Sequence, residues 1–452
     1  MTGAYARILQ HLPLVLPDLL STAFCPNLVA YNVCVNSKVF EEVEYLYEHF
    51  NTKFNSIDEE NVSEKFHKIN FAEVLYTDKS HYKRKSSRYQ KKIVLTMAVI
   101  VQEWFDKIKP DYIFFPIIES IDAMLTYRLA QSNGIKTICY AHGRHINVSF
   151  FSELHTEVLP SYYKLLPLIN DNIKKAESFV KEFKRHPSQL NYFSKVDDFE
   201  GESYEDIEKA TAFERLLSNI YLKLTTEKHN QTLSLWVKFQ VYIEKILIPV
   251  QKIIYLFIEK FYIQPDKKLP KSYDYFPLHF APESSINTPA PFYIDQLRVI
   301  DKILLERKGT PPLVIKEHPA MFSKRPISFY RKVKKIPFVQ FAKQGSSSIQ
   351  LLKSANTVYS VTGTVCLEAF LLGIGWKQFG DNYLNSWIKD RNSAGKSINP
   401  IEFVNDVLNV SGDFQLYSPV RNSKRNEILF SKKNIQNMAK HLVWHIDKLN
   451  TK

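Results

Sequence analysis

The chain alternates short apolar strands with longer helical segments, and this alternation is the feature that most constrains its fold. In residues 92–146, the helical pattern IVLTMAVIVQEWFDKI is followed by the buried strand DYIFFP, a second helical pattern that stops at Gly134, and the strand IKTICY. Two strands joined by a helix form a right-handed unit of a parallel sheet. Because the alternation resumes at residue 273 and runs to a closing helix, the sequence predicts an α/β fold.

The length of 452 residues is more than one hydrophobic core ordinarily fills, which favours two domains. We predict an N-terminal domain over residues 1–265, which includes a helical insertion at about 160–265. A C-terminal domain is predicted over residues 273–430 and a closing helix over residues 431–452. The expected architecture is two α/β domains that face each other across a cleft.

The excess of basic residues, a formal net charge of +13, indicates anionic partners such as nucleotides, phosphorylated lipids, acidic glycans or an acidic membrane surface. No aromatic-basic motif of the recognised nucleic-acid-binding kinds is visible, so nucleic acid is not an expected partner. The four cysteines have neither C-x-x-C spacing nor a disulfide-dense pattern, which is typical of a reducing cytosol. We expect no structural zinc.

The sequence predicts no membrane-spanning helix, but one segment suits a membrane surface. The N-terminus is a poor secretory signal, and no stretch reaches the roughly 18 uncharged apolar residues that a spanning helix needs. We therefore expect a cytoplasmic protein. Residues 245–263 mix lysines with aliphatic and aromatic residues. Two alternatives are open for this segment: a helix packed within the insertion, or an amphipathic helix lying on the anionic inner face of the cytoplasmic membrane.

Polar residues follow the apolar strand in the stretch LVIKEHP, namely Lys316, Glu317, His318 and Pro319. In open α/β sheets, ligands bind beyond the carboxyl ends of the strands. An imidazole there can donate a hydrogen bond or, when protonated, pair with a phosphate, and proline fixes the turn. A second His-Pro pair at residues 186–187 has no preceding strand, and we assign it no function. We predict that the four residues of the first stretch bind a nucleotide.

The stretch SVTGTVCLEAFLLG predicts a strand, a tight turn at Thr362, Gly363 and Thr364, and a helix. The turn offers backbone N–H groups and two hydroxyls at a helix N-terminus, which is a favourable site for an anion. If Thr364 is the N-cap, a capping box would place Glu or Gln at position 367, which is Leu. Glu368 is then a carboxylate in apolar surroundings that needs a partner, either a ribose hydroxyl or the helix dipole.

Three familiar nucleotide or metal motifs are absent from the sequence. GIGWKQFG follows a helix and lacks the G-x-G-x-x-G spacing of a dinucleotide site. There is no D-x-D triplet, which chelates a metal in many single-domain nucleotide-sugar transferases, and no G-x-x-x-x-G-K-[ST]. We therefore expect a phosphate to be held by backbone, His and Lys, with no metal and no resident cofactor.

Three stretches in the same order, PLHFAPESS, VIKEHP and SANTVYSVTGTVCLEAFLLGIG followed by FGDNY, resemble the C-terminal half of the capsule polysaccharide synthase family, which includes bacterial Kdo transferases. The resemblance covers about residues 275–383, and residues 110–150 more loosely. It implies a GT-B glycosyltransferase with two Rossmann-like domains. The C-terminal domain would bind the nucleotide sugar and the N-terminal domain mainly the acceptor.

The resemblance also implies roles for single residues and a class of substrate. Contacts to the nucleotide phosphate transfer onto the His-Pro pair and the Ser/Thr-rich turn, which are His318, Pro319, Thr362, Gly363 and Thr364. The implied donor is a CMP-linked ulosonic or nonulosonic acid such as Kdo, and the acceptor a bacterial surface polysaccharide or lipid-linked glycan. Trp376 and Lys377 stand where relatives usually carry Pro and small aliphatic residues, which indicates a reshaped pocket.

A glycosyl transfer needs a carboxylate near the anomeric carbon, as a base or as a nucleophile. Glu119 lies just beyond the strand DYIFFP, on the edge that we expect to face the nucleotide domain, and is our candidate. The alternative is that Glu119 only favours the start of the helix that begins at Ser120. Asp122 and Glu283 are the reserve candidates. The residues expected to hold the sugar or the acceptor are His142, Gly143, Arg144 and His279.

Two classes of function remain open at this point. The first is a metal-independent glycosyltransferase that moves a nucleotide-activated sugar. The second is a non-catalytic glycan-binding or assembly partner of a polysaccharide export complex, which needs no carboxylate aimed at a cleft.

Overall fold

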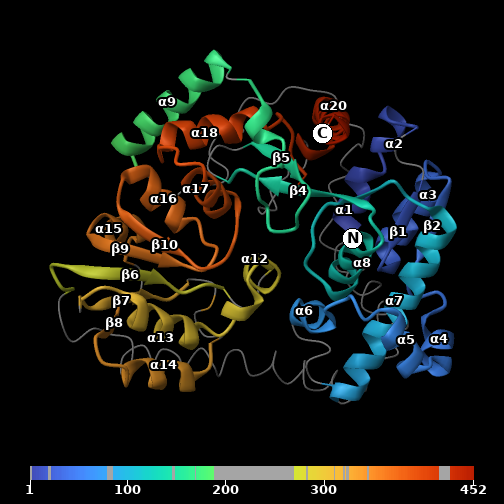
Figure 1. Cartoon of the computed structure of the whole chain (residues 1–452), viewed down its shortest axis with the longest axis horizontal. Coiled ribbons are helices and arrows are strands. Elements are labelled where there is room, and N and C mark those ends of the chain that lie inside the picture. The colour runs from blue at the N-terminus through green and yellow to red at the C-terminus, as the bar shows by residue number, and fades with distance from the viewer. Residues whose placement is uncertain are drawn as a thin grey trace, which may run out of the picture. The chain divides into compact units, whose positions relative to one another are not determined.

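A computed structural model describes residues 3–18, 22–78, 85–144, 148–167, 169–187, 269–280, 284–309, 311–318, 321, 325–343, 346–416 and 428–451. The chain divides into two compact units (Figure 1). Of the described residues, the first unit contains those up to Asn172 and those from Asn405 onward. The second unit contains those from Ile173 to Val404. Each unit is described separately below.

The second unit is built on a parallel five-stranded sheet in the order β10-β9-β6-β7-β8. Its strands are β6 (Tyr273–Pro277), β7 (Leu313–Lys316), β8 (Val339–Phe341), β9 (Ala355–Ser360) and β10 (Gly375–Gln378). When the strands are numbered along the unit, this is the doubly wound order 3-2-1-4-5 of a Rossmann-like sheet. The direction of winding therefore reverses between β6 and β9.

Helices cover both faces of this sheet (Figure 1). Side chains alternate along a strand, so Phe276 and Ile315 pack against one helical layer while Tyr275 and Val314 pack against the other. The first layer contains α13 (Gln296–Glu306) and α14 (Ile327–Lys334), and the second α15 (Ser348–Lys353) and α16 (Val365–Leu372). Burial on both faces explains the nearly continuous apolar runs of these strands. The unit also contains α12 (Ser284–Asn287), η3 (Pro291–Tyr293) and α17 (Tyr383–Ser393).

The first unit contains the strand-helix-strand unit that the sequence predicts. β3 (Tyr112–Phe115) pairs in parallel with β4 (Lys136–His142), and α8 (Ile121–Ser132) connects them. The long α7 (Ser87–Ile108) packs in the same core. A further strand, β5 (Ser149–Ser152), pairs antiparallel with β4 and was not predicted. A separate parallel pair consists of β1 (Thr22–Cys25) and β2 (Glu42–Tyr45).

Helices complete the first unit. They are α1 (Gly3–Leu9), α2 (Leu12–Val15), α3 (Leu28–Ser37), α4 (Phe50–Ser56), α5 (Glu59–Lys65), α6 (Phe71–Tyr76), η1 (Tyr163–Leu165) and α20 (Lys432–Asn450). Two more helices, α9 (Asn170–Arg185) and α18 (Pro400–Asn409), each contain a sequence boundary between the units. The apolar face of α20 is buried with Leu9 of α1, Phe151 of β5 and Phe414. The closing helix is thus part of the first unit, and the second unit ends at Val404 rather than at the predicted residue 430.

The α/β fold class is confirmed by these parallel sheets and their helical layers. Most of the predicted helical insertion, including residues 245–263, lies outside the described residues, so its contact with a membrane stays a prediction. Within the described ranges, no helix is long and apolar enough to cross a membrane. The cleft between the domains also stays a prediction.

Candidate functional site

The strand order of the second unit identifies one edge of its sheet as the place for a ligand. In doubly wound sheets, a crevice forms beyond the carboxyl ends of the two strands at which the winding reverses. Here those strands are β6 and β9. The loop after β6 contains His279. The loop after β9 contains the turn of Thr362, Gly363 and Thr364, called the T-G-T turn below. The His279 loop and this turn therefore lie at the reversal, while the stretch LVIKEHP follows the neighbouring strand β7.

A side chain joins these two loops. The backbone N–H of Val361 donates a hydrogen bond to Nε2 of His279 at 3.1 Å, and Oγ of Ser360 lies 3.1 Å from the same nitrogen. Because Nε2 accepts a hydrogen bond from a backbone N–H, the proton of the neutral ring lies on Nδ1. The N–H of Gly363 donates to Oγ of Ser360 at 2.9 Å. The His279 ring is thus part of the turn itself.

Gly363 is required by this close approach. A Cβ atom at position 363 would lie 2.7 Å from Oγ of Ser360 and 3.0 Å from Cε1 of His279. The first of these distances is too short unless the Ser360 hydroxyl or the turn shifts. The glycine of the T-G-T turn therefore lets the imidazole reach the backbone.

The side chains of Lys316, the last residue of β7, and of Glu317, which follows it, lie on opposite faces of the sheet. Nζ of Lys316 is 2.5 Å from Oγ of Ser348 at the start of α15, and burial lowers the pKa of this lysine. Glu317 points to the opposite face, where its buried carboxylate accepts hydrogen bonds from Arg325 and Tyr330. The ring of His318 lies 5.9 Å from that of Phe280, centroid to centroid.

The helix after the T-G-T turn begins as predicted, with Thr364 as N-cap of α16. The Thr364 side chain makes no capping hydrogen bond and lies 3.5 Å from Oε1 of Glu368 instead. Thr362 and Glu368 are buried. Burial raises the pKa of Glu368 to about 7, against a smaller opposing effect of the Thr364 hydroxyl. A carboxyl that changes charge near neutral pH therefore lies in the first turn of α16.

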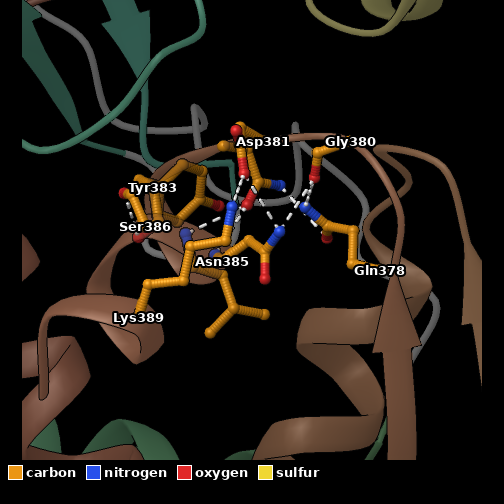
Figure 2. A network of polar contacts seen from close by, with 9 residues as sticks. Gln378, Gly380, Asp381, Tyr383, Asn385, Ser386 and Lys389 are labelled. Carbon is orange, nitrogen blue, oxygen red and sulfur yellow. Dashed lines mark hydrogen bonds and ion pairs between the residues drawn. The ribbon is translucent and has the colours of Figure 1, made fainter. Parts of the chain in front are cut away.

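The loop after β10 belongs to the same edge and was missed as a site element in the sequence. Figure 2 shows its polar contacts. The amide of Gln378 donates to the carbonyl of Gly380 at 2.9 Å, and the side chain of Asn382 caps α17. Asp381 accepts a hydrogen bond from Lys389 at 2.5 Å, and half of its side chain is exposed. A Cβ atom at Gly380 would lie 2.7 Å from Cγ2 of Thr362, so this loop packs directly on the T-G-T turn.

The candidate residues of the first unit lie at the carboxyl edge of β3 and β4. Glu119 is half-buried between β3 and α8, and Asp122 is in the first turn of that helix. At the end of β4, Nδ1 of His142 accepts a hydrogen bond from the N–H of Arg144 at 3.0 Å. The guanidinium of Arg144 pairs with Glu157 at 2.8 Å. Because parallel strands end at one edge, these residues leave the sheet on the same side.

Burial has a strong effect on His142, lowering its pKa to about 4, so that the ring is neutral at pH 7. Gly143 is the buried residue that links His142 to Arg144.

Two predicted residues, Glu283 and Pro319, lie outside the described residues.

Metal-type ligands approach one another in one described place, where atoms of Glu44, Glu48 and His49 lie within 4.8 Å of one another. This cluster belongs to the first unit and is partly or fully exposed. Exposed acidic groups often gather without an ion. The absence of a metal from the reaction therefore stays a prediction.

Comparison with protein-family models and with curated proteins gives no match. Similar solved structures include the Thermosulfurimonas dismutans KpsC beta Kdo 2,7 transferase, with 12% identity, a TM-score of 0.33, and coverage of 82% of this chain and 96% of that one. The beta Kdo 2,4 transferase of the same KpsC has 11% identity and a TM-score of 0.34, over 65% of this chain and 78% of that one.

A UDP-GlcNAc 2-epimerase from Methanocaldococcus jannaschii has 11% identity and a TM-score of 0.22, over 94% of this chain and 99% of that one. Likenesses this distant carry no conclusion about activity. The function is therefore argued from the site.

The contact between Gly363 and Ser360 predicts an energetic coupling. Gly363→Ala is expected to destabilise the protein by about 1 to 3 kcal/mol, the usual cost of overpacking. Ser360→Ala removes the nearest clashing atom, so the double variant should lose less free energy of unfolding than the two single variants together, by about 0.5 kcal/mol or more. Denaturant unfolding of the four proteins measures this coupling. Strict additivity would show that the turn has another geometry.

The raised pKa of Glu368 predicts a pH-dependent stability. Between pH 4.5, the ordinary pKa of Glu, and about 7, the carboxyl is protonated in the folded state and ionised in the unfolded state. The wild type should therefore lose stability as the pH rises from 4.5 to about 7, and it should regain none of this stability at higher pH. Glu368→Gln should remove up to about 3 kcal/mol of this dependence, which urea unfolding at several pH values measures. Glu103→Gln, on the exposed side of α7, is the control for the removal of one carboxylate and should retain the loss of stability that Glu368 causes.

Proposed function

We propose that the carboxyl edge of the second unit binds the nucleotide part of a nucleotide sugar and that the chain is a metal-independent glycosyltransferase. The observation that carries this proposal is the meeting of the His279 loop and the T-G-T turn at the reversal between β6 and β9. This is the place where doubly wound sheets bind nucleotides. The order of motifs in the sequence, which resembles that of the capsule polysaccharide synthase family, supports the same assignment.

The groups at this edge suit a phosphate. The N-terminus of α16 directs backbone N–H groups and the positive end of its dipole toward the turn, where an anion is stabilised. Lys316 adds a cation at the end of β7, and the hydroxyl of Thr364, which is not used for capping and lies 3.5 Å from Oε1 of Glu368, adds a further polar group. His318 follows Lys316 by two residues and supplies an imidazole. A nucleoside monophosphate or diphosphate could be held by these groups.

The donor follows from the resemblance and the overall charge. We propose a CMP-linked ulosonic or nonulosonic acid such as Kdo, with a bacterial surface polysaccharide or lipid-linked glycan as acceptor. The basic character of the chain suits both an acidic donor and an acidic glycan.

The transfer step requires a carboxylate, and we assign it to Glu119 of the first unit. In this step the acceptor hydroxyl forms a bond to the anomeric carbon, and its proton passes to the carboxylate. The bond between the anomeric carbon and the phosphate oxygen breaks, and the nucleotide leaves with the electron pair. If the carboxylate acts as a nucleophile instead, a glycosyl-enzyme forms first and the acceptor then displaces it. Asp122 and Glu283 are the alternatives for this role.

The nucleotide site is tested by titration of the protein with CMP, CDP, UDP and GDP in a calorimeter. We expect CMP or CDP to bind, and His318→Ala and Thr364→Ala to weaken binding by about one to two decades, the worth of one charge-assisted hydrogen bond. Both residues are on loops, so the folding midpoint should change little. Binding of none of the four nucleotides would reject the proposed function. Unchanged affinity in both variants would mean that the nucleotide binds elsewhere.

The catalytic carboxylate is tested with Glu119→Gln, which keeps the shape and removes the charge. Turnover should fall by about two or more decades, the usual effect of losing a general base, while nucleotide affinity stays at the wild-type value. Asp122→Asn, in the first turn of α8, tests the alternative carboxylate and removes a similar charge near the same helix N-terminus. Turnover that falls only in the Asp122 variant would move the role to that residue. Donor hydrolysis without acceptor, measured alongside, separates an enzyme from a non-catalytic glycan-binding protein.

A further inference from the structure

We propose that Glu317 and Arg325 form a buried clasp that joins the loop after β6 to the loop after β7 and so positions His279 and His318 in the ligand site. The proposal rests on the function proposed above and assigns positioning roles to residues that need not touch the ligand. Glu317 thereby receives a role other than the nucleotide contact predicted from the sequence.

The carboxylate of Glu317 is at the centre of the clasp and is 2% exposed. Oε2 accepts hydrogen bonds from Nε of Arg325 at 2.8 Å and from the hydroxyl of Tyr330 at 2.6 Å. Oε1 accepts from Nη2 of Arg325 at 3.2 Å and from the backbone N–H of His318 at 2.7 Å. The carboxylate thus fixes the backbone of His318 and orients the guanidinium.

Arg325 carries the link to the other loop. Its Nη2 also donates to the backbone carbonyl of His279 at 2.8 Å. The same carbonyl accepts a hydrogen bond from Nε2 of Gln296 at 3.0 Å, and the N–H of His279 donates to Oε1 of Gln296 at 2.9 Å. Buried side chains of α13 and of the segment before α14 therefore form hydrogen bonds with both backbone polar groups of His279.

The need for these contacts follows from where the sheet ends. The N–H of Leu278 donates to the carbonyl of Lys316 at 2.8 Å, next to the last register pair of β6 and β7, Pro277 and Lys316. At His279 the chain is still half-buried but has left the strand. Side chains then supply the hydrogen bonds that a neighbouring strand would otherwise supply. The His279 ring reaches the T-G-T turn, and the orientation of the ring depends on how the His279 backbone is held.

A buried ion pair is a poor device for stability alone. The desolvation of both charges offsets most of their attraction, and an apolar pair of similar size is often at least as stable. The clasp does what an apolar pair cannot do, since it directs several charge-assisted hydrogen bonds to two specified backbone positions. This argues for a role in geometry, and the two positions it fixes are the two histidines of the proposed site.

The same unit contains a matched control. Arg307 and Asp274 form a second buried pair, 3.6 Å apart with each side chain 4% exposed, but near the amino end of β6. Arg325→Lys and Arg307→Lys both keep the charge and lose the planar fork of donors. Lysine at position 325 cannot reach Glu317 and the His279 carbonyl with the fixed geometry of arginine. A general loss of stability should therefore appear in both variants, whereas an effect on the site should appear only in Arg325→Lys.

Two measurements on the full chain test the clasp. Calorimetric titration with the nucleotide that binds the wild type should show about tenfold or weaker affinity for Arg325→Lys and near-wild-type affinity for Arg307→Lys. Hydrogen exchange without nucleotide should be faster over residues 278–280, 318 and 361–364 in Arg325→Lys and unchanged there in Arg307→Lys. Gln296→Met removes two hydrogen bonds to the His279 backbone without altering a charge, and it should change both measurements in the same direction. This variant replaces Arg325→Lys if that protein does not fold.

The outcomes separate the two proposals. Equal affinity and equal exchange in the Arg325 and Arg307 variants would overturn the clasp and leave the nucleotide site intact. If the wild type binds no nucleotide, the proposed function fails, and the exchange data alone decide whether Glu317 and Arg325 hold the two loops. Faster exchange confined to residues 278–280, 318 and 361–364 would then still support the clasp, and its absence would reject it.

Discussion

The second unit depends on hydrogen bonds to the backbone N–H and carbonyl of His279. β6 is the central strand and is covered on both faces, so the chain leaves it inside the protein and needs hydrogen-bond partners there. Gln296 and Arg325 supply them, which fixes where α13 begins and where the segment before α14 lies. Arg325 in turn needs a buried anion, and Glu317 provides it. One exit from a strand thereby accounts for three buried polar side chains that a hydrophobic core would not otherwise contain.

The charges at the carboxyl edge are compatible with the external anion that the proposed function requires. Glu317 is neutralised by Arg325, so the pair adds no net charge to the site. Glu368 lies in the first turn of α16, where an ionised carboxylate would compete with a phosphate for the same dipole. Burial raises the pKa of Glu368 to about 7, which keeps a large fraction of this group uncharged near neutral pH. An anion bound at the turn would favour the protonated form further.

The sequence was sufficient for features that depend on local patterns. Apolar runs followed by Gly or Pro predicted β6, β7 and β9, and the residues after them were expected at one edge because parallel strands share it. Arg325 and Gln296 were missed, because each reaches a backbone group 46 or 17 residues away and no periodicity reports such a contact. β5 was missed because SFFS is short and pairs antiparallel. The boundary at Val404 was missed because α20 packs on Leu9 and Phe151, far away in the sequence.

The two units end their parallel strands in chemically different loops, and this difference suits the transferase proposed above. The second unit presents imidazoles, hydroxyls, a lysine and a helix N-terminus, which are groups that hold a phosphate and stabilise a leaving nucleotide. The first unit presents the carboxylate of Glu119, a neutral His142 and an arginine already paired with Glu157. An unpaired carboxylate beside the phosphate loops would repel an anionic donor, whereas Glu317 and Asp381 at that edge are paired with Arg325 and Lys389. Chemistry that uses both groups is therefore served best when separate sheets carry them, as they do in this chain.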